Sequence, residues 1–156
     1  MKISEKTEYA IKLVLELSIN YNKKLKIKDI SKKHKIPFKF LQQLVLQLRS
    51  LGYIETYRGK DGGVILAKHP KDINLKEFIK AIEVSISPIA CLDKGCSESQ
   101  ICVLYPILEE IKSKTEEILQ RFTFKDIIKK FVSYRIKNKA YPKIHYVINK
   151  KRLTEL

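Results

Sequence analysis

The apolar residues in the first third of the chain recur three and four places apart, which predicts three consecutive helices. The first helix is expected to start after Ser4, a suitable N-cap, and to end at the polar residues 20–22. A short second helix is expected over residues 27–34. Pro37 separates it from a third helix, which Gly52 ends. The apolar face predicted for the third helix consists of Leu41, Leu44, Val45, Leu48 and Leu51.

The pattern then changes from a helical period to an alternating one. Residues 53–57 and 64–67 are predicted to form two strands, and the glycine-rich residues 58–63 form the turn between them. Three helices followed by a two-stranded hairpin is the element order of a winged helix-turn-helix. In that arrangement the first two helices hold the third so that its polar face can lie in the major groove of DNA.

The second half of the chain predicts a long amphipathic helix that packs against a partner helix. It is preceded by a helix that Asn74 caps, with a glutamate three residues later as in a capping box, and that residues 87–88 end. Thr123 is expected to cap a short closing helix. Apolar spacings of four and three alternate along the long helix, which is a heptad seam. The residues of this stripe are Leu104, Ile107, Leu108, Ile111, Thr115, Ile118, Leu119 and Phe122.

These elements predict a mainly helical α+β fold, with a winged helix-turn-helix domain followed by a long dimerisation helix. The DNA-binding domain is expected at residues 1–84 and a cysteine-containing sensor loop at residues 85–103. The dimerisation helix and the short closing helix are expected at residues 104–132. Residues 133–156 are expected to form a basic tail.

The charge is concentrated at the two ends of the chain. The chain carries 32 Lys and Arg against 17 Asp and Glu, a net charge of +15. Residues 1–69 account for +9 of it, residues 70–133 for none, and residues 134–152 hold seven basic side chains and no acid. Two basic ends around a neutral middle favour a polyanionic partner. General lysine enrichment is the alternative explanation.

The polar face of the third helix and the hairpin tip carry groups suited to DNA. Glutamine can make two hydrogen bonds to adenine, and lysine or arginine can do so to guanine. At the tip, Arg58 and Lys60 can reach phosphates or a minor groove, and Gly59 allows a close backbone approach. A solvated helix face and simple turn glycines are the alternatives. The outward residues of the third helix are Lys39, Gln42, Gln43 and Arg49.

The cysteines of the chain, three in all, lie close together between residues 91 and 102. In a reducing compartment an odd number of cysteines argues against a disulfide framework. A metal site, a reactive thiol and coincidence remain open. A zinc site would need a fourth nitrogen or sulfur ligand, and the histidines of the chain are His34, His69 and His145.

Several motifs match one known pattern over residues 1–132. They include FLQQL at residues 40–44, YRGKDGGV at residues 57–64 and IE at residues 82–83, followed by the cysteine loop. On these motifs the chain resembles the bacterial IscR/NsrR/CymR (Rrf-two) family of transcriptional regulators. The resemblance implies a homodimer, usually a repressor, that binds double-stranded DNA. By position it places DNA contacts at Lys39, Phe40, Gln43, Arg49 and Arg58, and puts Gln42 where some members carry a glutamate that tunes sequence choice.

Cys91, Cys96 and Cys102 resemble the three-cysteine loop that ligates an iron–sulfur cluster, 2Fe-2S or 4Fe-4S, in the sensing members of this family. Thiolates are soft ligands that suit such a cluster. The first spacing is one residue shorter than in the iron–sulfur-homeostasis members, and Tyr105 stands where those members have a histidine. Nitric-oxide-sensing members use an acidic side chain of the other subunit, and Glu8 occupies that position. A surface glutamate without a role is the alternative for Glu8.

The sequence therefore predicts a cytoplasmic homodimeric repressor governed by a cluster that senses iron, nitric oxide or redox state. One alternative is a cluster-free regulator of the same fold, controlled by a partner protein or metabolite as in cysteine-metabolism members. A thiol enzyme is a second alternative, but no histidine or acid forms an evident nucleophile–base pair with a cysteine. No apolar stretch is long enough to span a membrane, and residues 1–6 lack a signal-peptide core.

Overall fold

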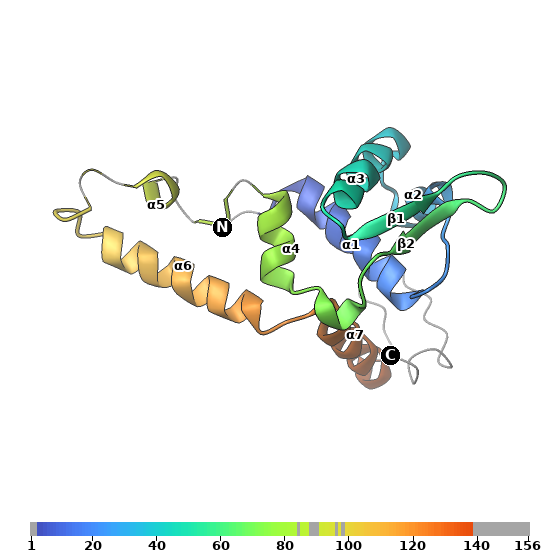
Figure 1. Cartoon of the computed structure of the whole chain (residues 1–156). Helices are drawn as coiled ribbons and strands as arrows, with labels where there is room; N and C mark the ends of the chain where they lie inside the picture. The colour runs from blue at the N-terminus through green and yellow to red at the C-terminus, as the bar shows by residue number, and fades with distance from the viewer. Residues whose placement is uncertain (1–2, 84, 88–90, 96, 98, 139–156) are drawn as a thin grey trace.

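A computed structural model describes residues 3–83, 85–87, 91–95, 97 and 99–138 as a compact unit from which a helical arm extends (Figure 1). The compact unit holds the winged helix-turn-helix, and the arm is the long helix α6 with the cysteine loop at its far end. The elements are α1 (Glu5–Ile19), α2 (Ile27–His34), α3 (Phe38–Ser50), β1 (Ile54–Tyr57), β2 (Gly63–Leu66), the 3-10 helix η1 (Pro70–Asp72), α4 (Leu75–Ile82), α5 (Cys91–Lys94), α6 (Tyr105–Gln120) and α7 (Phe124–Asn138).

The first three helices begin and end close to the residues predicted from the sequence. Ser4 caps α1, with its hydroxyl accepting a hydrogen bond from the Thr7 backbone N–H at 3.2 Å. Lys35 ends α2 in the left-handed region, at φ +54°. Gly52 follows α3 with φ +72°, a conformation that glycine adopts without a steric penalty. The helix predictions for residues 4–52 are confirmed.

The hairpin has a third strand-like neighbour that the sequence did not predict. Strands β1 and β2 pair antiparallel, with Ile54 opposite Leu66. Leu25, in the loop between α1 and α2, exchanges two backbone hydrogen bonds of 3.0 and 2.8 Å with Val64 of β2. Gly63 makes this junction possible, because a Cβ at that position would lie 2.7 Å from the Leu25 carbonyl oxygen. The base of the wing is therefore fixed to the α1–α2 loop.

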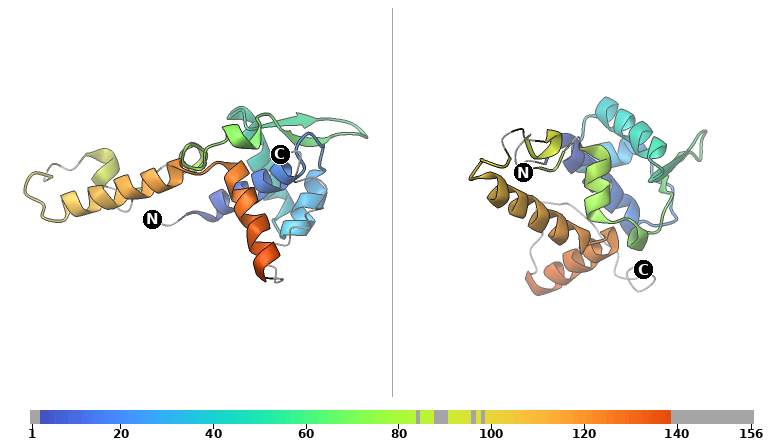
Figure 2. Two further views of the ribbon diagram at one scale, coloured as in Figure 1. Left: turned by 90° about the horizontal axis from the view of Figure 1, so that it is seen from below. Right: turned by 60° about the vertical axis from the view of Figure 1, so that its left-hand side comes forward.

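Helix α7 returns from the arm and packs against the compact unit (Figure 2). Its first residue, Phe124, is fully buried beside Phe78 of α4, with ring centroids 4.9 Å apart in an edge-to-face arrangement. Tyr53 packs on the other side of the same ring at 5.0 Å. A backbone hydrogen bond of 3.0 Å from Phe124 to Ile73 joins the start of α7 to the segment before α4. The core thus includes residues from both ends of the described chain.

The structure corrects two helix boundaries and one buried position predicted from the sequence. The helix capped by Asn74 ends at Ile82, well before the predicted stop at residues 87–88, because Glu83 leaves the helical region and its side chain accepts a hydrogen bond from the Ser4 backbone N–H at 2.8 Å. The closing helix is not short: α7 continues to Asn138, past the predicted boundary at residue 132. Leu51 lies at the C-cap of α3 and is exposed, whereas it was predicted to be buried.

A buried carboxylate joins α1 to α2 and so helps to place the helix-turn-helix. Glu16 is almost fully buried, and its two oxygens lie 2.8 Å from Lys33 Nζ and 3.1 Å from His34 Nε2. Burial alone raises the pKa of Glu16, but hydrogen bonds from His34 and Lys33 outweigh it and hold the pKa below its ordinary value. Since both partners lie at the end of α2, this network fixes that end of α2 against α1.

We expect Glu16→Gln to lower the free energy of unfolding at pH 7 by about 2 kcal/mol, because it removes a buried, hydrogen-bonded charge. A carboxylate with a lowered folded pKa stabilises the fold above its unfolded pKa, near about pH 4.3, and loses that contribution as the pH falls through the lower folded value. The difference between the variant and the wild type should therefore shrink below about pH 4. Denaturant titrations across pH measure it, with Glu8→Gln, an exposed glutamate of the same helix, as the control. Equal stability of the two variants would contradict the assignment.

Candidate DNA interface and cysteine loop

Helix α3 presents the candidate base-reading residues on the face opposite its buried side. Leu41, Leu44, Val45 and Leu48 are buried against α1 and the hairpin. On the opposite face Leu46 is 54% exposed, next to the glutamines, and the sequence analysis missed it. An apolar side chain there can contact the thymine methyl group in a major groove. The polar residues of this face, Lys39, Gln42, Gln43 and Arg49, are all exposed.

Two of the residues proposed for DNA contact also have a role within the fold. Phe40 is half-buried, and its ring lies edge-to-face with that of Tyr9 at 5.6 Å, so it braces α3 against α1. Arg49 donates a hydrogen bond of 3.2 Å from Nη1 to the Thr56 hydroxyl of β1. This bond holds the guanidinium between α3 and the base of the wing. Its orientation is therefore set by the two elements expected to touch DNA.

The wing tip is a tight glycine turn with basic side chains. Arg58, Gly59 and Lys60 are all exposed. Gly59 has φ +92°, and its carbonyl oxygen accepts a hydrogen bond of 3.0 Å from the Gly62 N–H. A Cβ on Gly62 would lie 2.5 Å from the carbonyl oxygen of Tyr57, so the turn cannot accept a side chain there without moving. The turn thus projects Arg58 and Lys60 at the end of the hairpin.

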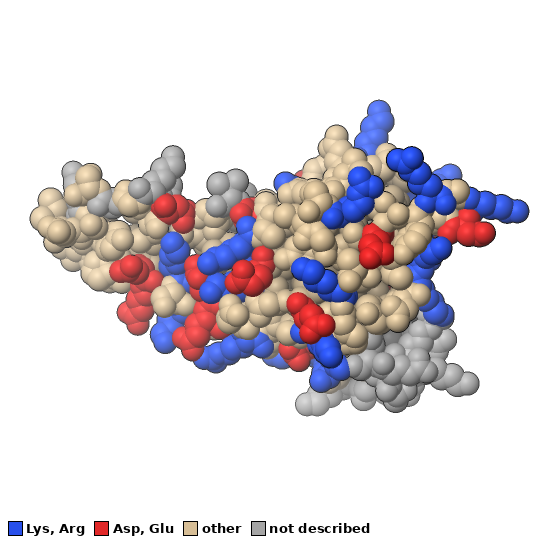
Figure 3. Space-filling view, viewed as in Figure 1, with Lys and Arg blue, Asp and Glu red and all other residues tan. Residues whose placement is uncertain are grey.

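A row of lysines beside the wing was missed by the sequence analysis. In the loop that pairs with β2 and the first turn of α2, Leu25 and Ile27 are partly buried, whereas Lys24, Lys26 and Lys28 are exposed. Lys24 Nζ lies 4.4 Å from the centroid of the Tyr57 ring in β1. The signal in the sequence was the alternation of lysine and apolar residues ahead of α2. Figure 3 shows basic side chains gathered at the end of the molecule that holds α3 and the wing, whereas both signs of charge mix along the arm.

The long helix α6 has an apolar stripe that the described part of the chain leaves exposed. None of its residues is buried, and Ile107, Ile111 and Ile118 are 53%, 48% and 54% exposed. These positions belong to the heptad seam expected from the sequence. No helix in the described part of the chain is long and apolar enough to cross a membrane. An amphipathic helix with an open stripe is suited to packing against a second helix.

The cysteine loop connects α4 to α6 at the far end of the arm. Cys91 is the first residue of α5, and Cys102 lies just before α6, where its carbonyl oxygen accepts a hydrogen bond of 3.1 Å from the Tyr105 N–H. Both are free thiols and only partly buried. Cys96 lies outside the described residues. Soft thiolates on one short loop fit an iron–sulfur cluster by donor chemistry, although the described residues alone bring no three metal-ligating side chains together.

The residues considered as a fourth cluster ligand lie on different elements of the structure. His34 is held by the buried carboxylate of Glu16, and its side chain is 3% exposed. His69 Nδ1 accepts a hydrogen bond of 3.1 Å from the Lys71 N–H, which caps η1. Glu8 is exposed on the first turns of α1 and pairs with Lys12 at 2.5 Å. His145 lies outside the described residues, and Tyr105, which begins α6, is discounted because a phenolate is a poor cluster ligand. The two described histidines thus serve the compact unit.

Comparison with known proteins decides the family. Residues 3–130 match the sequence model of Rrf2, described as an iron-dependent transcriptional regulator. The chain belongs to the Rrf2 family. This match covers the compact unit, the cysteine loop and the arm, and it confirms the resemblance drawn from the sequence motifs.

Relatives and solved structures of the Rrf2 family agree with this assignment. The chain is 33% identical over 132 residues to the HTH-type transcriptional regulator NsrR of Bacillus licheniformis, which covers 82% of this chain and 92% of that protein. The structure of CymR, the global cysteine regulator of B. subtilis, superposes with a TM-score of 0.65 at 27% identity and covers 86% of this chain and 98% of that one. For IscR of T. potens the TM-score is 0.67 at 25% identity, with 94% and 97% covered.

The Rrf2 assignment confirms two predictions and leaves others as proposals. The mainly helical α+β fold with its winged helix is that of the CymR and IscR structures. The relatives are named transcriptional regulators, which confirms that this chain is a regulator and overturns the thiol-enzyme alternative.

Proposed function

We propose that this Rrf2 protein is a homodimeric, cytoplasmic DNA-binding repressor whose hold on its operator is governed by an iron–sulfur cluster in the cysteine loop. The observation that carries the proposal is the layout of the molecule. The residues suited to DNA lie on the compact unit, and the cysteines lie on a loop attached to the arm (Figure 1). A signal at the cysteines can therefore act on DNA binding by changing how the unit and the arm are held together.

The DNA-reading surface is proposed to consist of α3, the wing and the lysine row. Gln42, Gln43 and Leu46 face outward to read bases in a major groove. Arg58 is proposed to enter a minor groove, and Lys60 to bind phosphate. The other proposed contacts are Lys39, Phe40, Arg49, Gly59, Lys24, Lys26 and Lys28.

The dimer is proposed to form along the apolar stripe of α6. A second copy of the same helix matches the stripe in length and character, because a twofold axis brings the same residues of both helices together. The four functional segments proposed are the DNA-reading unit at residues 1–84, the sensor loop at 85–103, the dimerisation segment at 104–132 and the tail at 133–156. Helix α7 crosses the last boundary.

The cluster is proposed to be held by Cys91, Cys96 and Cys102, with Glu8 of the second subunit as the fourth ligand. Glu8 lies on α1 of the DNA-reading unit and occupies the position at which the family resemblance implies an acidic ligand from the other subunit. A bound cluster would be an iron centre whose assembly or oxidation state responds to iron availability, nitric oxide or oxidation. The protein supplies thiolates on a loop and, through α1, a direct tie to the DNA-reading unit.

A cluster-free regulator is the second candidate function. The structure of CymR, which is described as a global cysteine regulator, matches this chain over 98% of the CymR length. In that case a partner protein or a metabolite would act on the same arm, and the cysteines would have no iron to bind. Metal content separates the two candidates.

Arg58→Ala is expected to weaken operator binding about ten- to hundredfold, because an arginine in a narrow groove or on a base edge contributes both charge and hydrogen bonds. Fluorescence anisotropy at fixed salt measures the effect. Arg121→Ala is the matched control, since Arg121 is an exposed arginine next to α6, remote from α3 and the wing. An Arg58 variant that binds as tightly as the control would show that the wing does not touch DNA.

The lysine row should appear in the salt dependence of binding. Replacing Lys24, Lys26 and Lys28 together by glutamine should reduce the slope of log affinity against log salt by about two to three, since each phosphate contact contributes about 0.9. The effect should be the same for operator and unrelated DNA. The control replaces Lys114, Lys129 and Lys130 together by glutamine, which removes the same charge away from the wing. It should leave the slope nearly unchanged. Equal slopes for the two triple variants would exclude the row from the interface.

A further inference from the structure

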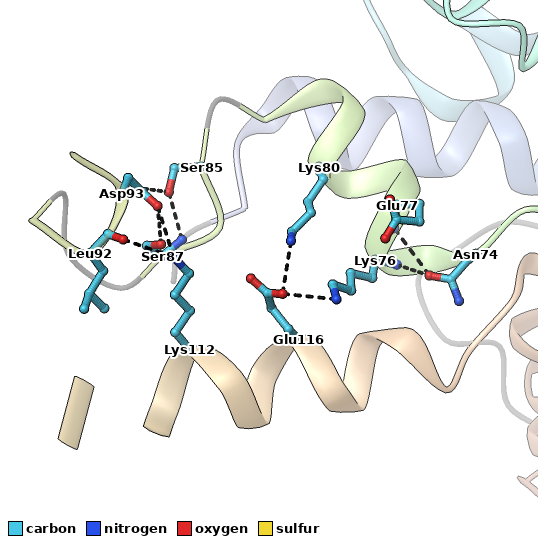
Figure 4. A network of polar contacts seen from close by, with 10 residues as sticks. All are labelled: Asn74, Lys76, Glu77, Lys80, Ser85, Ser87, Leu92, Asp93, Lys112 and Glu116. Atoms are coloured by element: carbon cyan, nitrogen blue, oxygen red, sulfur yellow. Dashed lines mark hydrogen bonds and ion pairs between the residues drawn. The ribbon is translucent and has the colours of Figure 1, made fainter. Parts of the chain in front are cut away.

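Side chains on neighbouring turns of α6 bind in two directions, one to the compact unit and one to the cysteine loop (Figure 4). Glu116 reaches across to α4, which belongs to the compact unit. Lys112, one turn earlier on the same side of α6, reaches to the cysteine loop. The two side chains are four residues apart, so they are neighbours on the helix surface.

The connection to α4 is an ion-pair cluster around one carboxylate. Oε2 of Glu116 lies 3.0 Å from Lys80 Nζ and 3.1 Å from Lys76 Nζ. Burial raises the pKa of Glu116, but the hydrogen bonds from Lys80 and Lys76 outweigh it and hold the pKa below its ordinary value, so the group is charged at neutral pH. Phe78 and Ile79 of α4 are buried in the core of the compact unit. Glu116 therefore fixes the arm to a helix that moves with the DNA-reading residues.

The connection to the cysteine loop depends on two residues that directly follow Cys91. Lys112 Nζ donates a hydrogen bond of 3.2 Å to the Leu92 carbonyl oxygen and lies 3.5 Å from Asp93 Oδ1. The Asp93 carboxylate also accepts hydrogen bonds from the hydroxyls of Ser85 and Ser87, in the segment that leaves α4. Lys112 thus binds the two residues that follow Cys91 in the chain.

We propose that Lys112 and Glu116 form a partner-exchange switch that transmits the state of the cysteine loop to α4. This inference rests on the proposed cluster function. While Cys91 is fixed as a ligand, Leu92 and Asp93 bind the Lys112 ammonium group and keep it from Glu116. Glu116 then binds the two lysines of α4. When the loop is released, Lys112 loses these partners and turns to Glu116.

The exchange loosens α4 for an electrostatic reason. A third ammonium group on the same carboxylate repels the two lysines of α4 and weakens their hold. Because the side chains of positions 112 and 116 lie within reach on one helix face, the exchange needs no backbone movement in α6. A looser junction lets the two DNA-reading units of a dimer turn relative to the arms, so they no longer match two half-sites together. The cluster-loaded form is therefore the tight DNA binder.

Two substitutions test the switch in opposite directions. Lys112→Met removes the ammonium group that competes with Lys76 and Lys80 for Glu116. The operator affinity of the cluster-free protein should therefore rise to that of the cluster-loaded protein. The ratio of the loaded to the cluster-free affinity should fall from about fivefold or more to near one. Glu116→Gln removes the ion pairs with Lys76 and Lys80, so the operator affinity of the cluster-loaded protein should drop to that of the cluster-free protein. Lys114→Met and Glu117→Gln are matched controls, because this exposed pair lies on the same helix and joins two residues of α6 to each other. The visible spectrum and iron content should be unchanged in all four variants.

Hydrogen exchange in the cluster-free protein gives a second readout that does not depend on DNA. Backbone amides of α4 should exchange more slowly in Lys112→Met than in the wild type, and more quickly in Glu116→Gln, with no change in the control variants. If the wild type shows a cluster-dependent affinity that Lys112→Met retains in full, or if α4 exchange is the same in all variants, the switch is wrong. If the wild type binds no cluster, the proposed function itself fails, and iron analysis identifies that case separately.

Discussion

Ile111→Lys is expected to turn the protein into a monomer and to lower operator affinity by at least about a hundredfold, because a monomer loses the second half-site that the dimer binds at high effective concentration. Ile111 is half-exposed on the uncovered stripe of α6, where a second helix is proposed to bury it. An unpaired ammonium in that seam would be desolvated, at a cost that apolar contact cannot offset. Sedimentation equilibrium measures the assembly, and Ile118→Lys should behave in the same way.

Ser113→Lys is the matched control for this experiment. It adds the same charge to the same helix at an exposed position outside the stripe, and it should leave both the dimer and the affinity intact. Normal dimers in both isoleucine variants would mean that the stripe is not the interface.

The second large effect is expected at the cysteines. Alanine at any of Cys91, Cys96 or Cys102 should abolish the visible chromophore and the bound iron of protein purified without oxygen, since the loop offers three thiolates in all and a cluster needs about four ligands. The fold should survive, because the two cysteines among the described residues are only partly buried and outside the core. Far-ultraviolet circular dichroism checks the fold in the same samples. A single alanine variant that keeps its full iron content would remove that cysteine from the ligand set.

Glu8→Ala should have a milder effect than the cysteine variants. A carboxylate is a harder and weaker ligand than a thiolate, so water or another group can replace it, and the cluster should remain but react faster with oxygen. Glu5→Ala is the control, because Glu5 is an exposed glutamate on the same turn of α1 that pairs with Tyr9. Identical spectra and oxygen lability in both variants would make Glu8 a plain surface residue.

The amino-terminal elements could be predicted because each carries its own local signal. Ser4 and Gly52 lie at helix ends where the backbone itself demands a cap or a left-handed residue, Pro37 separates the second and third helices, and the apolar spacing between them is regular. The end of α4 carried no such signal. It is set by Glu83, which bonds to Ser4 at the far end of the sequence. A contact of that range cannot be found from spacing alone.

The candidate site could be predicted in the same partial way. The outward face of α3 and the basic wing tip follow from helical period and turn chemistry. Leu46 could not be predicted as a site residue, because an exposed leucine breaks the expected pattern of apolar and polar positions. Lys24 could not be predicted either, because the loop before α2 lies beside the wing only through its pairing with β2. The residues of α6 that bind other elements, Lys112 and Glu116, look in the sequence like an ordinary solvated helix face.

The most direct test of the account is operator binding by protein purified without oxygen, measured before and after the cluster is removed, with iron and sulfide counted in the same sample. We expect a red-brown protein whose iron and acid-labile sulfide depend on the three cysteines. Its affinity for the operator should fall about fivefold or more when the cluster is lost. A colourless protein without iron, which binds the operator equally well whatever the iron supply, would contradict the account and favour the cluster-free regulator.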